Sequence, residues 1–500
     1  MSETWANPGP DLLLELRGTR RRAGLEDALR EAVRSGRLAP GTLLPSSRAL
    51  AAELSLARNT VADAYGQLVA EGWLTARQGA GTRVAGSAGP PPGRALEPRP
   101  YRPSRKRSYD LSPGVPDLSA FPRAAWLAAA RKALTAAPSA ALGYPDPAGL
   151  PALRQTLAHY LARVRGVRAA PENIVICSGF AQAITLLATV LREQGASALA
   201  IEGYGLREHR RAITAAGLAT PVLGVDGSGA RVSQLAGAGA GGVLLTPAHQ
   251  FPLGVPLAAR RRAAVLQWAS EHGSLVIEDD YDGEFRYDRR PLGALQGLAP
   301  GLVAYAGTAS KSLAPALGLA WLAVPPRLTS AVTEAKVVAD GYTGIFEQLT
   351  LAEFIDSGQY DRHIRRSRLR YRRRRDRLTS VLAQRRPGVR VTGIAAGLHV
   401  LAELGGGLQE ADEAALASRA ARAGLTIRGL GWFRQPGGQD DGDIQGNGDG
   451  QGNGDGQGNG DGQPRNSPGD GPPGALVVGY GTPPEHAFAG ALDTLCDVLP

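Results

Sequence analysis

Two stretches decide how the larger part of this chain folds: LVIEDDYDGEF at residues 275–285 and VAYAGTASKSLAP at residues 303–315. Each begins with a short apolar run that is typical of a buried strand. Three similar runs are NIVICSG (173–179), ALAIEGY (198–204) and GVLLTPA (242–248). Stretches with helical periodicity, such as 180–193 and 257–272, alternate with these runs. The alternation predicts an α/β fold with a mostly parallel sheet.

Each of the five apolar runs ends in small or polar residues. These are Ser178, Tyr204, His249 with Gln250, Asp279 with Tyr281, and Ser310 with Lys311. In open parallel sheets, ligands bind outside the carboxyl ends of the strands. Five such ends therefore predict one ligand site.

The lysine in this set stands out, because the chain contains only four lysines and otherwise uses arginine. A lysine amine can form a Schiff base with an aldehyde, and a carboxylate such as Asp279 can keep a pyridine nitrogen protonated. The phenol of Tyr281 can hold a ring hydroxyl. Backbone N–H groups at Gly179 and Ala181, where a helix is expected to begin, can cradle a phosphate.

Each residue also has a simpler explanation when it is taken alone. Lys311 could be a surface lysine, and Asp279 with Asp280 could be a metal-binding pair or a helix cap. Together these residues favour a pyridoxal phosphate site.

Composition limits the remaining possibilities. A chain of 500 residues predicts more than one domain. The two cysteines form neither a disulfide framework nor a metal-spaced cluster, so we expect no metal. We expect a soluble cytoplasmic protein, because there is no signal peptide pattern and no long apolar run. The net charge of +10 predicts a polyanionic partner.

Two changes in composition divide the chain. Residues 85–108 are rich in proline and arginine and are predicted to be an extended linker. Residues 437–474 contain QGNGDG three times in succession. The period of six does not match a calcium-binding nonapeptide repeat, so we predict a disordered surface insertion at 437–474.

The segment before the linker, residues 12–84, predicts three helices and a two-stranded wing. The helices are expected at 24–35, from Ser46 or Ser47 to Leu54, and at 57–71. This is the layout of a winged helix-turn-helix. Its third helix begins with Arg58, Asn59 and Thr60, residue types that can contact bases and phosphates. The alternative is a small protein-interaction domain.

The stretch LAPGTLLPSSRALAAELSLARNTVADAYGQLVAEGWLTARQGAGTRVA resembles the winged helix-turn-helix of the GntR family of bacterial regulators. The combination of PG-x-x-LPSSR-x-LA, R-x-TV, the EG wing and G-x-GT is specific. The resemblance implies a double-stranded DNA operator as partner. It assigns DNA contacts to Ser47, Arg48, Arg58, Thr60 and Gly81.

Residues 109–500 resemble the aminotransferase-like region of fold type I pyridoxal phosphate proteins. The resemblance rests on YPDPAGLPALRQTLAHYLARVRGV, TPAHQFPLGVPL, IEDDYDGEFRYDRRPLGALQGL and YAGTASKSLAP. A GntR-type winged helix, a linker and this region occur in the same order in MocR-type regulators. The resemblance implies a homodimer that binds pyridoxal 5'-phosphate and senses vitamin B6, an amine or an amino acid.

The resemblance also assigns roles to residues. It implies that Lys311 forms the Schiff base, Asp279 binds the pyridine nitrogen, Tyr281 lies near the ring hydroxyl and Tyr204 stacks on the ring. The other assignments are Gly179, Phe180, Ala181 and Ser310 near the phosphate, and His249 and Gln250 where aminotransferases place a ring-contacting asparagine.

The chain departs from the family pattern at two positions. Gly318 stands where relatives have an arginine that pairs with the cofactor phosphate, and Val477 or Val478 stands where aminotransferases have a carboxylate-binding arginine. The nearest substitutes are Arg428 and Arg434. We therefore expect a sensor with slow or absent transamination. The alternatives are an active aminotransferase with an accessory DNA-binding domain and a regulator that has lost the cofactor.

The segment DRHIRRSRLRYRRRRDRL, residues 361–378, contains ten arginines. Such a run predicts a helix with a solvated face. A second DNA-facing surface, an anion contact and a dimer interface are the alternatives.

Overall fold

The computed structural model describes residues 21–77, 81–86, 109–287, 292–405, 410–437 and 474–500. The chain divides into two compact units, Met1–Pro103 and Ser104–Pro500, and each is described by itself. Most of the linker expected at 85–108 and of the insertion expected at 437–474 lies outside the described residues. No helix within the described ranges is both long and apolar enough to cross a membrane.

The first unit is a winged helix-turn-helix. Its elements are α1 (Arg21–Arg34), α2 (Ser47–Glu53), α3 (Arg58–Ala70), β1 (Leu74–Arg77) and β2 (Gly81–Val84). Ser46 is the residue that caps α2, because its side chain accepts a hydrogen bond from the backbone N–H of Ala49 at 3.2 Å. The inward face of α3 is Val61, Ala64, Tyr65 and Leu68, as the helical period predicts.

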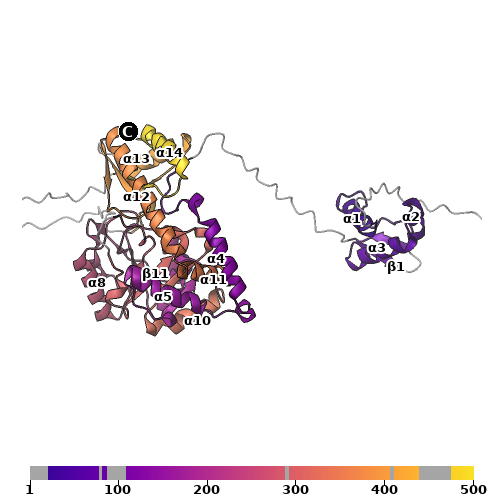
Figure 1. Cartoon of the computed structure of the whole chain (residues 1–500), viewed down its shortest axis with the longest axis horizontal. Coiled ribbons are helices and arrows are strands. Elements are labelled where there is room, and N and C mark those ends of the chain that lie inside the picture. The colour runs from indigo at the N-terminus through magenta and orange to yellow at the C-terminus, as the bar shows by residue number, and fades with distance from the viewer. Residues whose placement is uncertain (1–20, 78–80, 87–108, 288–291, 406–409, 438–473) are drawn as a thin grey trace, which may run out of the picture. The chain divides into compact units, whose positions relative to one another are not determined.

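A seven-stranded sheet forms the centre of the second unit (Figure 1). In spatial order its strands are β4 (Ile174–Cys177), β12 (Ala320–Ala323), β11 (Val303–Thr308), β10 (Leu275–Asp279), β9 (Gly242–Leu245), β5 (Leu199–Glu202) and β6 (Val222–Leu223). Strand β12 runs antiparallel to both neighbours, and the other neighbouring pairs are parallel. The predicted α/β fold with a mostly parallel sheet is confirmed.

Helices cover both faces of this sheet, which is why its strands are continuous apolar runs. Helices α6 (Phe180–Glu193) and α10 (Thr329–Ala339) pack on one face, and α8 (Ala259–His272) packs on the other. Along β10, Leu275 and Ile277 face the first pair, and Val276 faces α8. Further helices of this unit are α4 (Arg123–Ala136), α5 (Pro151–Arg165), α7 (Arg207–Ala215), α9 (Ala309–Ser312) and α11 (Ile345–Asp356).

A smaller antiparallel sheet follows the long helix α12 (Gln359–Arg385). Its strands are β13 (Val389–Thr392), β14 (His399–Leu404), β17 (Ala475–Gly479) and β16 (Arg428–Gly429). Helices α13 (Glu410–Arg422) and α14 (Glu485–Val498) belong to the same part of the unit (Figure 1). The short strands β3 (Tyr109–Asp110) and β15 (Leu425–Thr426) pair in parallel, and β7 (Val225–Asp226) pairs with β8 (Gly229–Ala230).

The arginine-rich segment lies on α12. Its exposed arginines, as a solvated face predicts, are Arg362, Arg365, Arg366, Arg368, Arg372, Arg373 and Arg377. Arg374 departs from that expectation because it is buried, with its Nη2 2.8 Å from carboxylate oxygens of both Asp117 and Glu485. Arg374 thus completes the buried stripe of α12 and ties this helix to the start of α14. The second DNA-facing surface stays a prediction.

Candidate cofactor-binding site

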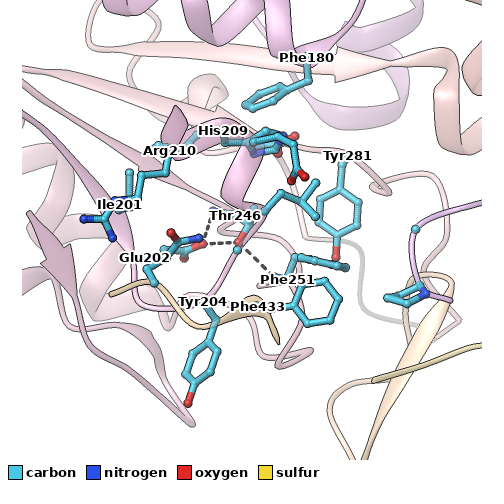
Figure 2. Close-up of a pocket in the computed structure, with 18 of the residues that line it drawn as sticks. Phe180, Ile201, Glu202, Tyr204, His209, Arg210, Thr246, Phe251, Tyr281 and Phe433 are labelled. Atoms are coloured by element: carbon cyan, nitrogen blue, oxygen red, sulfur yellow. Dashed lines mark hydrogen bonds between the residues drawn. The ribbon is translucent and has the colours of Figure 1, made fainter. Parts of the chain in front are cut away.

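A cavity of about 530 Å³ lies at the carboxyl ends of the central strands (Figure 2). Residues at the ends of β5, β9, β10 and β11 line it, and so do residues 112–115 and several residues between 428 and 435. This is the edge at which the sequence predicts a ligand site. The predicted site residues that line the cavity are Lys311, Asp279, Tyr281, Tyr204, Phe180 and Ser310.

The three consecutive acidic residues at the end of β10 make different contacts. Glu278 accepts hydrogen bonds from two backbone N–H groups, at 2.8 and 2.9 Å. Asp280 accepts two hydrogen bonds from Arg165 at 2.6 and 3.0 Å and one from the Tyr305 hydroxyl at 2.8 Å. Asp279 lines the cavity instead and has no hydrogen-bond partner among the described residues. The contacts of Asp280 leave Asp279 as the carboxylate that is available to a ligand.

Asp279 and Lys311 face a common space and perturb each other. Burial raises the pKa of Asp279 well above its usual value, and the nearby Lys311 amine opposes that shift in part. Burial likewise lowers the pKa of Lys311, against the attraction of Asp279 and Asp282. Lys311 has no hydrogen bond to another described residue. A buried carboxylate and a partly buried amine without such partners fit a ligand with a ring N–H and an aldehyde.

A residue behind the cavity wall positions the Tyr281 side chain. Its hydroxyl lies 3.0 Å from Nδ1 of His249, and the same nitrogen lies 2.8 Å from Oδ2 of Asp282. Neither His249 nor Gln250 lines the cavity. The Gln250 amide donates to two backbone carbonyls at 2.8 and 3.1 Å. The structure therefore places these two residues in support of the wall.

Two aromatic rings lie together at the cavity. Phe180, the first residue of α6, and His209 on α7 have ring centroids 4.6 Å apart (Figure 2). Burial lowers the pKa of His209 to about 4, so the imidazole is neutral near pH 7. Tyr204 also lines the cavity, but its ring points away from Phe180 and packs with the cluster that contains Phe433.

The residues expected near the phosphate are only partly brought together. Gly179 is the N-cap of α6 and makes no side-chain cap, so the first N–H groups of the helix are available to an anion. Gly179 and Ala181 flank Phe180 without lining the cavity. Gly318 has a left-handed backbone (φ +57°), a conformation that favours glycine over the arginine of the family pattern.

Sequence reasoning missed Glu202 as well as His209. Glu202 lines the cavity and accepts hydrogen bonds from the backbone N–H of Thr246 at 3.2 Å and from its hydroxyl at 2.5 Å. Burial raises the pKa of Glu202 to about 7. Glu202 could have been found as the residue that ends an apolar strand. His209 gives no such signal, because it depends on the register of α7.

The predicted DNA contacts belong to the first unit. Arg48, Arg58 and Asn59 are exposed, and Ser47 and Thr60 are partly exposed. Arg58 to Thr60 form the first turn of α3, whose N-cap makes no side-chain hydrogen bond. Gly81 has φ +80°, and a Cβ at this position would lie 2.9 Å from Cδ1 of Leu43. Only glycine fits the start of β2 without strain.

The fold and the cavity define a winged helix-turn-helix joined to an aminotransferase-like unit. Residues 21–84 match the family described as "Bacterial regulatory proteins, gntR family", and residues 109–428 match "Aminotransferase class I and II". The chain belongs to the MocR-type transcription regulators. The family match supports the expected pyridoxal 5'-phosphate cofactor.

Relatives of similar organisation are HTH-type regulators. The "HTH-type pyridoxine biosynthesis transcriptional regulator PdxR" of Corynebacterium glutamicum is 33% identical over 84% of this chain and 90% of its own length. The "HTH-type transcriptional regulator TauR" of Rhodobacter capsulatus is 33% identical over 74% and 80%. The α-aminoadipate aminotransferase LysN of Thermus thermophilus shares the fold, with a TM-score of 0.63 and 23% identity over 79% of this chain and 92% of its own.

Proposed function

We propose that the aminotransferase-like unit senses pyridoxal 5'-phosphate, or an amine or amino acid that reacts with it. Binding of this ligand changes the affinity of the winged helix-turn-helix for DNA. The observation that carries this proposal is the pair Lys311 and Asp279. Both line one cavity, both are largely buried, and neither has a hydrogen bond to another described residue. A structural pair would be satisfied within the protein.

Different residues around the cavity would bind different groups of the cofactor. When bound, pyridoxal phosphate supplies an aldehyde for the Lys311 amine and an electron-withdrawing ring. Asp279 would accept a hydrogen bond from the ring nitrogen, and Tyr281, oriented by His249, would bind the ring hydroxyl. The first turn of α6 and the Ser310 hydroxyl would bind the phosphate.

Residues of the smaller antiparallel sheet favour the binding of an effector without efficient turnover. Val477 and Val478 are buried apolar residues of β17 and cannot bind a carboxylate. Arg428 lines the cavity from β16, stacks on Trp432 at 5.2 Å and has no ion pair among the described residues. A guanidinium in this position suits the carboxylate of an amino acid, although it differs from the arginine of the transaminase pattern.

We also propose that the protein is a homodimer. Large apolar side chains are exposed around α4, α10 and α11. Tyr144 is 93% exposed, Val338 88% and Leu127 68%, and patches of exposed apolar side chains are typical of interaction surfaces. Tyr144 and Tyr342 contact each other with ring centroids 6.0 Å apart. Val338→Asp should shift the mass measured by light scattering toward the monomer, and an unchanged mass would count against this surface.

The cofactor proposal is tested by titration of the purified chain with pyridoxal 5'-phosphate. Lysine-linked cofactor absorbs visible light, so wild type should develop a visible band and Lys311→Ala should not. Arg260→Ala is the control, because Arg260 is an exposed cation on α8, away from the cavity and from the proposed dimer surface. A band in Lys311→Ala, or no band in wild type, would overturn the assignment.

A further inference from the structure

A second cavity of about 470 Å³ adjoins the cofactor cavity. Arg210 and Gln435 line both cavities, so the two share a wall. The residues that line the second cavity are Arg207, Arg210, Arg211, Gly431, Arg434, Gln435 and Pro436. Four of these seven residues are arginines, and we refer to the space as the arginine cavity.

Three of the four arginines of the arginine cavity have no carboxylate partner among the described residues. No acidic residue from the described ranges lines it. Arg207, Arg210 and Arg211 have no ion pair among the described residues; Arg207 stacks on Trp432 at 5.5 Å, and Arg210 donates to the backbone carbonyl of Pro436 at 2.5 Å. Guanidinium groups gathered around one concave space attract an anion into it.

We propose that the arginine cavity binds the multiply charged anionic group of the effector, either a phosphate or a pair of carboxylates. The inference rests on the proposed function, since it specifies the effector that reaches the neighbouring cofactor cavity. Planar guanidinium groups bind phosphate and carboxylate oxygens in pairs, which gives both affinity and orientation. Arg210 belongs to both cavities and would sense occupancy of either one.

A small anion suits this space better than a DNA backbone does. The arginines line a cavity, whereas the phosphates of a duplex form a convex surface that contacts flat or grooved patches. Affinity for a small anion should fall as salt rises, because added ions screen the guanidinium groups.

The test is calorimetric titration of the full-length, cofactor-saturated chain with inorganic pyrophosphate, inorganic phosphate and succinate in separate runs. The variant is Arg207→Gln with Arg211→Gln, which keeps hydrogen-bonding groups and removes two charges. The control is Arg260→Gln, an exposed arginine on α8 away from both cavities. We expect at least one anion to bind wild type and the control equally, and the double variant at least about tenfold more weakly, since one charge-assisted hydrogen bond is worth that factor. Visible absorbance of the same samples reports cofactor loading independently.

Equal affinity in the double variant, or no binding of any of the three anions to wild type, would overturn the inference. A double variant that loses DNA affinity while it binds anions normally would also overturn it and assign the arginines to DNA. Arginine-dependent anion binding in a chain that never develops the visible band would retain the anion site and refute the cofactor proposal. Preference among the runs tells a phosphate ligand from a dicarboxylate.

Discussion

Asp279→Asn should have opposite effects on cofactor binding and on the stability of the cofactor-free protein. The substitution keeps the shape of the side chain and removes its charge. With the cofactor bound, Asp279 would make a charge-assisted hydrogen bond to the ring nitrogen. Such a bond contributes about 1.5–3 kcal/mol, against about 0.5–1.5 kcal/mol for a neutral one. The difference predicts cofactor affinity weaker by roughly 5- to 30-fold.

Without the cofactor, the same carboxylate destabilises the folded protein. It is buried, it has no hydrogen-bond partner among the described residues, and its pKa is raised well above the usual value. An acid with a raised folded-state pKa contributes stability below its unfolded pKa of about 3.9 and loses that contribution as pH rises through the folded pKa. The cofactor-free variant should therefore be the more stable protein at neutral pH, by about 1–3 kcal/mol.

The two effects are measured separately. Visible absorbance gives the cofactor affinity, and urea unfolding at acidic and neutral pH gives the stability of the cofactor-free chain. Asp497→Asn is the control, since that carboxylate is exposed and pairs with Arg385 at the surface. Unchanged cofactor affinity in Asp279→Asn, or a cofactor-free variant that is less stable than wild type, would refute this reasoning.

Three further predictions concern both units. Arg58→Ala should weaken specific DNA binding by about 1–3 kcal/mol in a gel-shift assay, and an equal loss on random DNA would indicate a phosphate contact instead. Gly81→Ala should destabilise the winged helix by about 1–2 kcal/mol, because alanine is strained at φ +80°; an unchanged melting temperature would contradict this. Glu202→Gln should flatten the stability-versus-pH curve between the ordinary pKa of 4.5 and the folded value of about 7, where wild type loses up to roughly 3 kcal/mol as pH rises. Coincident curves for both proteins would place the titration elsewhere.

The features that sequence reasoning found share a physical origin. Five strands were readable because they are buried on both faces, so their apolar runs are unbroken. Lys311 and Asp279 follow directly from such runs, and parallel topology alone brings the strand ends together. Helix α3 was readable because the helical period of its inward face is a local signal.

The features that were missed depend on tertiary register. His209 reaches the cavity through the rotation of α7, which no local pattern specifies. Arg374 has the same sequence context as its exposed neighbours, and only its place in the buried stripe of α12 separates it from them. Strand β12 is a four-residue run, AWLA, too short to reveal its antiparallel direction. Gln250 lies after the end of β9, and its amide bonds to the backbone around it and to Glu202.

The central claim is that cofactor linkage at Lys311 changes the affinity of the protein for DNA. The direct measurement is fluorescence anisotropy with the full chain and a DNA site selected from a random-sequence pool, with and without pyridoxal 5'-phosphate. We expect a change of about fivefold or more for wild type and for Arg260→Ala, which is the size of an ordinary coupling between two sites. Lys311→Ala should bind the same DNA and show no response. An equal response in Lys311→Ala, or wild-type affinity that does not change with the cofactor or with added amines, would contradict this claim.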